Sequence, residues 1–476
     1  MSSIDSARPA AAQRIDFYNK QGNKVYVRST QGRYNSLRWA MVWLTQLIFY
    51  GLCWLPWQGR QAVLFDIVER KFYLFGLVLW PQDAIYLAFL LMLAAFGLFL
   101  FTAVAGRVFC GFACPQTVYT AMFMWIEEKT EGSRLARIRL DQAPWHAGKI
   151  TRKGAKYLLW VALASVTGFT FVGYFTPIKT LAHNLANFSL GPWEGFWLLF
   201  YAMFTYLQAG VLREQVCKHM CPYSRFQGAM FDADTVTVTY DAARGEPRGA
   251  RHAKAQPNTQ VQAQAQTQAA PRGDCVDCGI CVQVCPAGID IRQGLQYECI
   301  GCGLCVDACN TVMDKVGYAR GLIRYGSERM LAGQRWAGSL KRPRIAVYSG
   351  LMLALLVGAS VMLSQRVPLR VDVIRDRGAL MRETDEGAIE NIYTLEIHNL
   401  AEQPRRFDIA VAGLPGIRQQ GALSVTVPAG SSSPLPVTVQ VPGDGELHGT
   451  RQLEFHITAS DDRHISVTQG SSFILP

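Results

Sequence analysis

A duplicated cysteine pattern constrains this chain more than any other feature. The spacing C-x2-C-x2-C-x3-C occurs twice between residues 275 and 309. This is the spacing of bacterial ferredoxin-type ligation, in which the fourth cysteine of one run ligates the cluster of the other run. The pattern therefore predicts two [4Fe-4S] clusters, one held by Cys275, Cys278, Cys281 and Cys309, and the other by Cys299, Cys302, Cys305 and Cys285.

Zinc ribbons and disulfides are the ordinary alternatives for closely spaced cysteines. Zinc ribbons pair two C-x2-C knuckles, whereas each run here has three equally spaced cysteines and a fourth that follows. Disulfides form in oxidising compartments, and the charge distribution described below places this part of the chain in the cytoplasm. The second run is followed by Asn310 instead of proline, which loosens the match without removing a ligand.

Composition indicates an integral membrane protein. Half of the 476 residues are hydrophobic, yet the formal net charge is +11. From Arg366 onward there are 10 Lys and Arg against 14 Asp and Glu, and no lysine follows Lys341. A chain that is basic at one end and acidic at the other fits two sides of a membrane better than one nucleic-acid surface. We expect the lipid bilayer as a partner, and no nucleic acid.

Five apolar stretches are long enough to cross a bilayer. They cover about residues 39–57, 84–106, 157–175, 193–212 and 345–363. No apolar segment of a cleavable signal peptide precedes the first, and the basic tail 1–38 is expected in the cytoplasm. Four spans form a membrane domain over 39–240 and return the chain to the cytoplasm, and a fifth span at 345–363 exports the C-terminus.

The remaining segments complete the predicted organisation. Residues 241–273, rich in Ala, Gln, Arg and Gly, predict a disordered tether to a ferredoxin domain at 274–320. Within 366–476, alternating apolar and polar residues recur at 393–397, 407–411, 423–427, 436–441, 453–457 and 465–467. This pattern predicts an immunoglobulin-like sandwich. The expected fold is an α-helical transmembrane bundle of about five spans, with an inserted α+β double-[4Fe-4S] ferredoxin domain and a C-terminal all-β immunoglobulin-like sandwich.

A second group of cysteines follows the second and fourth spans. Cys110 and Cys114, like Cys217 and Cys221, form C-x3-C-P motifs. On a continuous helix the cysteines of each motif would share one face. If a helix instead begins at each proline, the second cysteine lies at the positive end of the helix dipole, which favours a thiolate.

Four thiolates on one membrane face could share one site. Soft thiolates select Cu(I), zinc or iron–sulfur groups over hard cations. His219 and Met220, inside the second motif, are further copper-compatible ligands. The ordinary alternatives are a solvent-facing imidazole, a packed methionine and buried structural thiols.

The chain resembles the CcoG/FixG family of cytochrome oxidase accessory proteins. The resemblance rests on the RVFCGFACPQT and QVCKHMCPYSRFQGAMFD motifs, together with the ferredoxin motif, the fifth span and the C-terminal domain. It implies a bacterial inner-membrane protein that assists assembly of a cbb-type cytochrome c oxidase by reducing Cu(II) to Cu(I). Oxidase subunits or copper-delivery proteins would be its partners, and the electron donor is unknown. The residues in the catalytic role would be Cys110, Cys114, Cys217 and Cys221, holding copper or a further cluster.

Two other functions fit the same motifs. Membrane ferredoxins resembling the NapH type also combine four spans, C-x3-C-P motifs and two clusters, and they pass electrons from quinol to a periplasmic reductase. That type ends at its clusters, whereas this chain is expected to continue into a fifth span and a periplasmic sandwich. In the third interpretation the protein is a non-catalytic scaffold whose sandwich docks oxidase subunits and whose clusters are structural.

Overall fold

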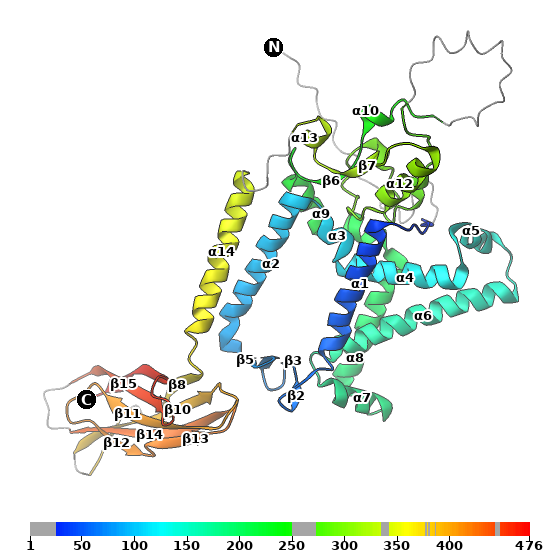
Figure 1. Cartoon of the computed structure of the whole chain (residues 1–476). Coiled ribbons are helices and arrows are strands. Elements are labelled where there is room, and N and C mark those ends of the chain that lie inside the picture. Colours follow the sequence, from blue (N-terminus) through cyan, green and yellow to red (C-terminus); the bar gives the residue numbers. More distant parts are fainter. Residues whose placement is uncertain are drawn as a thin grey trace, which may run out of the picture. The chain divides into compact units, whose positions relative to one another are not determined.

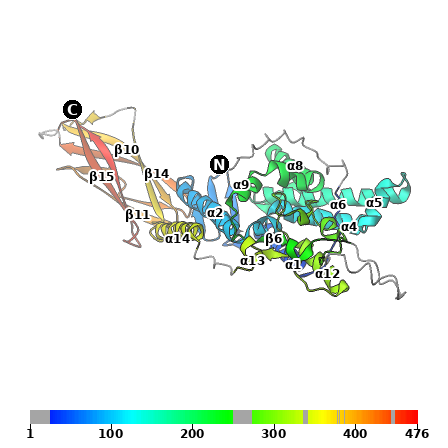
Figure 2. The same ribbon diagram turned by 90° about the horizontal axis from the view of Figure 1, so that it is seen from above.

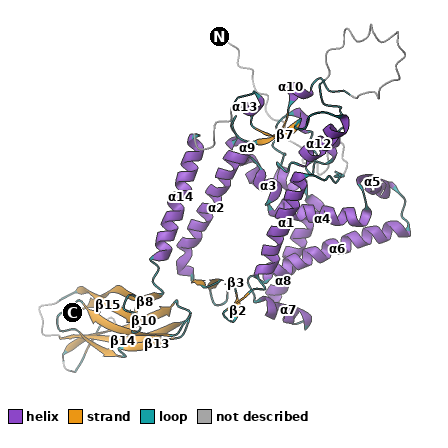
Figure 3. Cartoon of the chain, in the orientation of Figure 1, coloured by secondary structure: helices purple, strands orange, loops and turns teal. Residues whose placement is uncertain are grey.

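The computed structural model describes residues 25–249, 273–334, 342–376, 378, 381–385, 387–442 and 448–476. The chain divides into two compact units, Met1–Phe65 with Ile85–Leu356, and Asp66–Ala84 with Val357–Pro476. The first unit is mainly helical and the second mainly β-strand (Figure 3). The predicted fold class, a helical membrane protein with a ferredoxin region and a C-terminal sandwich, is confirmed.

Four helices among the described residues have the length and hydropathy of membrane spans. They are α2 (Ala84–Ala105), α6 (Ala147–Val172), α8 (Pro192–Thr205) with its π-helical continuation η2 (Tyr206–Leu212), and α14 (Pro343–Ser364). α6 begins ten residues before the stretch at 157–175, because the basic residues before 157 are also helical.

The first predicted span, at 39–57, has a different character in the structure. The helix there, α1 (Arg33–Leu52), begins within the basic tail and is less apolar than the four helices named above. It buries Arg38, Val42 and Gln46, which lie at four-residue spacing on one face. Polar side chains on the buried face lower its hydropathy and show that this face packs against protein. The count of five spans stays a prediction.

The helical core of the first unit forms where α4 (Pro115–Glu131) packs against α6 and η2. α1, α4, α6 and α8 gather in one group (Figure 1). Phe123 of α4 lies 5.3 Å from Trp160 of α6 between ring centroids, and the Trp160 indole donates to the Phe123 carbonyl at 3.1 Å. α2 lies beside the first part of α14 in Figures 1 and 2, with the rings of Phe99 and Tyr348 6.3 Å apart. The remaining helices around the core are α3 (Val108–Phe112), α5 (Arg134–Gln142), α7 (Ile178–Ala186) and α9 (Pro222–Met230).

The ferredoxin region is larger than the predicted 274–320. Strand β6 (Thr237–Tyr240) pairs antiparallel with β7 (Ile323–Gly326), so residues on both sides of that range complete the region. Between them lie α10 (Ala242–Gly245), α11 (Ile280–Gln283), η4 (Ile291–Gln293) and α12 (Leu304–Val316), and α13 (Glu328–Leu331) follows β7.

The predicted tether at 241–273 is therefore partly wrong. Residues 241–249 include the helical turn α10. Within this segment, Arg244 forms an ion pair of 2.6 Å with Asp274, which follows residues 250–272 in the chain. Residues 250–272 lie outside the described part of the chain.

The second unit contains the sandwich. One sheet has the order β12-β14-β10-β8, with β9 also on β10, and the other has the order β13-β11-β15-β16. The strands are β8 (Leu369–Arg375), β9 (Arg382–Glu383), β10 (Ala388–Asn399), β11 (Arg405–Ala412), β12 (Arg418–Gly421), β13 (Ser424–Val427), β14 (Ser432–Pro442), β15 (Thr450–Ala459) and β16 (Ser466–Ile474). All six predicted strands are present, and β8, β9 and β12 are additional. The fully buried Tyr393 and Phe455 rings meet edge to face at 5.2 Å between the sheets.

Five short strands precede α2. They are β1 (Pro56–Trp57), β2 (Arg60–Gln61), β3 (Val63–Asp66), β4 (Lys71–Leu74) and β5 (Leu77–Leu79). β4 and β5 form an antiparallel hairpin.

Replacing Phe455 with alanine should destabilise the sandwich by about 3–5 kcal/mol, because a fully buried ring would leave a cavity between the sheets. The loss of stability is measured by urea unfolding of the purified chain, with protease cleavage within residues 366–476 as the readout of the unfolded fraction. Leu423→Ala is the control, since Leu423 is 62 % exposed and should change stability by less than about 0.5 kcal/mol. Equal midpoints for the two variants would contradict the assigned core.

Candidate iron–sulfur and membrane cysteine sites

The predicted ligands of the two clusters, here called the first and second ferredoxin sets, interact across the two cysteine runs. Cys309, at the end of the second run, interacts electrostatically with Cys275, Cys278 and Cys281 of the first run. Cys285, at the end of the first run, interacts with Cys299 and Cys302 of the second. Cys305 interacts with Cys285, Cys299 and Cys302, and also with Cys281 of the first run. The exchange of the fourth cysteine between the runs stays a prediction.

The loops carrying these cysteines pass close to other backbone. Gly301 and Gly303 have φ values of 65° and 74°, in the left-handed region that favours glycine. A Cβ at Gly303 would lie 2.8 Å from the Tyr34 ring, so a larger residue would displace α1. The cysteine ligands are thus held in loops that only small residues can form.

Burial makes bare thiolates unfavourable at these positions. Desolvation raises the pKa of Cys285 to about 12 and that of Cys309 to about 12, and it raises the pKa of Cys305 well above its ordinary value. Coordination to a metal deprotonates a thiol outright. These cysteines fit ligation to iron, because the cationic irons supply the stabilisation that the protein alone lacks.

Two buried arginines provide a further test of this fit. Arg38 is 5 % exposed, interacts electrostatically with Cys285 and Cys302, and its Nε and Nη2 have no hydrogen-bond partner among the described residues. Arg107 lies near Cys299 and has an unpartnered Nε. Buried cations need a compensating negative charge. A cluster with four thiolate ligands is anionic and would supply that charge beside the second set.

The membrane cysteines of the two C-x3-C-P motifs also converge. Cys217 interacts electrostatically with Cys110, Cys114 and Cys221, and Cys110 and Cys114 interact with each other and with Cys221. The four thiols, from motifs 107 residues apart, therefore lie near one another. The Cys110 thiol also donates to Gln227 Oε1 at 3.4 Å.

The structure selects between the two conformations considered for each motif. Cys114 and Cys221 are the N-cap residues of α4 and α9, with extended backbone, and Pro115 and Pro222 occupy the first helical turn. The motifs are therefore breaks between helices. At Cys114, burial outweighs the backbone N–H groups of Gln116 and Thr117 at the start of α4, so the pKa of this thiol is raised.

His219 and Met220 are placed less favourably than predicted for copper ligands. Met220 is 58 % exposed and His219 is half-buried, at the end of the π-helix η3 (Val216–Met220). No three His, Cys, Asp or Glu side chains in the described ranges converge closely enough to hold a single metal ion. A ligation role for either residue stays a prediction.

Arg107 connects the membrane cysteines to the second ferredoxin set. Its guanidinium donates to the carbonyls of Tyr297, Ser224 and Cys299, the last at 3.2 Å. Its charge also acts on Cys110 and Cys217. One side chain thus contacts the loop of the second set while its charge reaches the membrane thiols.

The backbone of α3, which follows Arg107, also lies close to the backbone of the ferredoxin loop. A Cβ at Gly111 would lie 2.8 Å from the Gly301 carbonyl oxygen and 2.9 Å from Cys302 Cα. Only glycine permits α3 to approach the ferredoxin loop to this distance. A small cavity lined by Cys217, Pro286 and Ile300 lies at the same junction.

The N-terminus of α1 is fixed to the ferredoxin region as well. The Asp307 carboxylate of α12 accepts from the backbone N–H groups of Tyr34 at 3.3 Å and Asn35 at 2.8 Å. An acidic side chain at a helix N-terminus satisfies free N–H groups and complements the helix dipole. The Tyr34 and Tyr325 rings lie 4.9 Å apart beside this cap.

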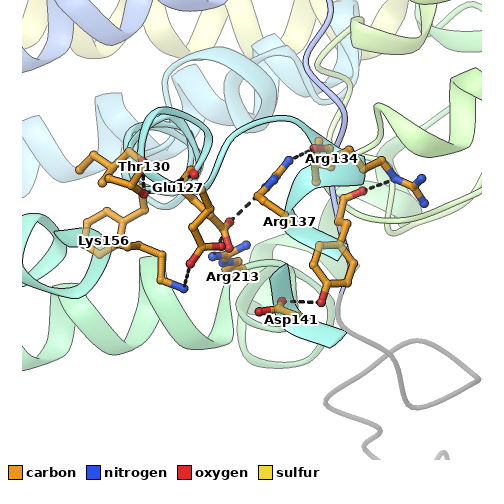
Figure 4. A network of polar contacts seen from close by, with 12 residues as sticks. Glu127, Thr130, Arg134, Arg137, Asp141, Lys156 and Arg213 are labelled. Carbon is orange, nitrogen blue, oxygen red and sulfur yellow. Dashed lines mark hydrogen bonds and ion pairs between the residues drawn. The ribbon is translucent and has the colours of Figure 1, made fainter. Parts of the chain in front are cut away.

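A buried ion network holds the helices that carry the membrane cysteines (Figure 4). Glu127 of α4 is fully buried and pairs with Arg137 at 3.3 Å and with Arg213 at 3.0 Å. Glu131, one turn later, pairs with Lys156 of α6 at 2.8 Å. Arg213 comes four residues before Cys217, so the network fixes the approach to the second motif.

Sequence reasoning missed the roles of Arg38, Arg107 and Asp307. Arg38 belongs to the basic tail 1–38, whose charge the sequence relates only to its location in the cytoplasm. Arg107 is the first residue of the RVFCGFACPQT motif, and its position three residues before Cys110 is the signal that the sequence offers.

Replacing Gly111 with alanine should loosen the contact between α3 and the ferredoxin loop, because the added Cβ meets backbone atoms that cannot rotate away. Amide hydrogen exchange of residues 299–303 should become roughly tenfold faster or more. The control is Gly154→Ala, since a Cβ at Gly154 on α6 meets no atom within 4 Å. Unchanged exchange in the Gly111 variant would show that this approach does not hold the loop.

Replacing Arg38 with glutamine should lower the reduction potential of one cluster by roughly 60 mV, the equivalent of a tenfold change for one electron. A nearby positive charge stabilises the more negative, reduced state. A redox titration followed by electron paramagnetic resonance measures the shift. Arg152→Gln removes the same charge from an exposed position on α6 and should leave both potentials unchanged. Two unshifted potentials in the Arg38 variant, at full iron content, would contradict this role.

Comparison with known proteins places three regions of the chain in described families. Residues 212–328 match a family described as "4Fe-4S dicluster domain", and residues 87–132 match a "4Fe-4S binding domain". Residues 359–476 match a family described as "IG-like fold at C-terminal of FixG". The chain is thus an iron–sulfur membrane protein of the electron-transfer type.

Similar proteins extend along most of the chain. The nitrogen fixation protein FixG of Rhizobium meliloti is 35 % identical over 452 residues, which cover 88 % of this chain and 84 % of the relative. Proteins RdxA and RdxB of Cereibacter sphaeroides are each 37 % identical, over 86 % and 88 % of this chain and 87 % and 88 % of their own lengths. The resemblance noted in the sequence is confirmed, and the chain belongs to the FixG/CcoG family.

Proposed function

We propose that this protein reduces Cu(II) to Cu(I) in support of the assembly of a cbb-type cytochrome c oxidase. The observation that carries the proposal is the convergence of four membrane thiols beside the second ferredoxin set, with Arg107 acting on both. An electron-transfer protein needs its redox groups close together, and the four thiols lie next to the second ferredoxin set.

The reaction is a one-electron reduction, in which each Cu(II) ion takes up one electron and becomes Cu(I). The iron–sulfur groups, when bound, supply electrons one at a time at low potential. The chain's own contribution is to hold Cys110, Cys114, Cys217 and Cys221 together at the junction.

We propose a further iron–sulfur cluster as the group held by the four membrane cysteines. Both C-x3-C-P motifs lie inside segments that match 4Fe-4S families. The four thiols also interact with one another. Copper is then the substrate and not a resident ion.

The charge pattern supports a location in the bacterial inner membrane. The part of the chain before Arg366 is strongly basic and the part after it is mildly acidic. We propose that the N-terminus and the ferredoxin region lie in the cytoplasm and the sandwich in the periplasm. Oxidase subunits or copper-delivery proteins would be met on the periplasmic side.

Replacing Cys110 or Cys217 with alanine should slow Cu(II) reduction by roughly tenfold or more, because one ligand of the membrane site is lost. The measurement is Cu(I) trapped by a chromogenic chelator after anaerobic addition of Cu(II) to protein that has been reduced with dithionite and then freed of excess dithionite. Absorbance of the ferredoxin clusters should persist, since their eight cysteines are unchanged.

Cys53→Ala is the matched control. Cys53 is fully buried at the end of α1 and donates to the Tyr50 carbonyl at 3.4 Å, away from the four interacting thiols. It should reduce Cu(II) at the normal rate. Normal rates in the Cys110 and Cys217 variants as well would remove these cysteines from the mechanism.

A further inference from the structure

One side chain joins the two C-x3-C-P motifs. Gln227 lies on α9, the helix that begins at the second motif. Its Oε1 accepts a hydrogen bond of 3.4 Å from the thiol of Cys110, which belongs to the first motif. Gln227 is 0 % exposed, so its amide is fully removed from solvent. The contact therefore places a buried polar group against one of the four membrane thiols.

The other end of this amide has no hydrogen bond. Gln227 Nε2 lacks a hydrogen-bond partner among the residues that the structure describes. A side-chain amide carries two N–H donors, and a buried donor is costly when it is left unpaired. Its oxygen receives a hydrogen bond only from a thiol, which is a weak donor. A protonated Cys110 therefore leaves the Gln227 amide poorly satisfied.

A deprotonated Cys110 sulfur would satisfy the amide better. Turning the amide over exchanges its oxygen and its nitrogen, so that an N–H group meets the sulfur where the oxygen lies now. A hydrogen bond to an ionised acceptor is about twice as strong as one between neutral groups. The oxygen that takes the place of Nε2 is the easier of the two groups to leave unpaired. The contact thus favours the deprotonated sulfur that a cysteine has when it ligates a metal.

Other groups around the membrane cysteines also suit negative charge. The positive charge of Arg107 acts on Cys110. Cys114 meets the backbone N–H groups at the start of α4. The Thr117 hydroxyl donates to the Cys110 carbonyl at 2.6 Å, which fixes the backbone that carries the sulfur. Gln227 completes this environment, because its amide is the side chain that lies against the Cys110 sulfur itself.

We propose that Gln227 is a positioning residue of the membrane cysteine site, and that its side-chain N–H donates to the Cys110 sulfur when this sulfur ligates an iron–sulfur group. Hydrogen bonds to the sulfurs are among the factors that set the potential of such groups. A donated N–H stabilises the additional negative charge of the reduced state, so it raises the reduction potential. The inference rests on the cluster that the proposed function assigns to these cysteines, and not on copper as the electron acceptor.

The hydrogen bond can be tested first in the natural protein, as the full chain purified without oxygen. The signal of the membrane site is the electron paramagnetic resonance signal that the Cys110→Ala variant loses. When the side-chain nitrogens of glutamine are isotopically labelled, pulsed measurements on this signal should detect coupling to a labelled nitrogen. The coupling should disappear in Gln227→Leu. A natural protein without the coupling, or a variant that retains it, would overturn the proposal.

A redox titration measures the effect on the potential. Gln227→Leu should shift the redox equilibrium of the membrane signal roughly tenfold toward the oxidised state, about 59 mV for one electron, because leucine has no donor. Gly228→Ala is the control on the same helix, since a Cβ at Gly228 meets no atom within 4 Å, and it should leave the potential unchanged. Unchanged potentials of the two ferredoxin clusters show that each variant is folded. An unshifted membrane signal in Gln227→Leu would overturn the proposal.

This inference and the proposed function fail in different ways. If the coupling and the shift are observed but the natural protein does not reduce Cu(II), the copper function is wrong and the role of Gln227 stands. If Cys110→Ala loses no signal, the membrane cysteines hold no such cluster, and the role of Gln227 is overturned together with that assignment. If the signal is present without the coupling, the role of Gln227 alone is overturned.

Discussion

The structure of the first unit depends on the contact between the second ferredoxin set and the membrane cysteine site. Buried cysteines that carry a cluster need positive charge nearby, yet buried arginines are costly when unpaired. Arg38 and Arg107 meet this requirement together with the cysteine loops, and Gly111 lets the backbones approach closely. Each component is unfavourable alone and is compensated by the others.

The same constraint explains the surrounding helices. α1 receives its N-terminal cap from Asp307, which belongs to the ferredoxin region. α4 and the segment around Arg213 are joined through Glu127. Because breaking a buried ion pair leaves an uncompensated charge, such pairs fix the relative positions of helices more than they add to stability. The cysteine loops consequently rest on a rigid support.

Much of this organisation could be predicted from the sequence, because spacing and hydropathy are local properties. The cysteine repeats, four of the apolar helices and six strands of the sandwich follow from such patterns. What could not be predicted depends on pairing between distant residues. Strand β6 forms because it pairs with β7, which lies more than 80 residues later in the chain. Helix α1 carries Arg38 and Gln46 on its buried face, and the neighbours of that face are also distant in sequence. The ligand set of the membrane site likewise requires two motifs 107 residues apart to meet.

The backbone hydrogen bonds of Pro247 and Gly249 have a consequence for the first cysteine run. They join Gly249 to Cys275 and Gly273 to Pro247, each at 3.1 Å. The backbone of Cys275 is thus positioned from outside its own run, by the segment that follows β6. A change at Pro247 or Gly249 would consequently reach the first predicted cluster ligand without altering any cysteine.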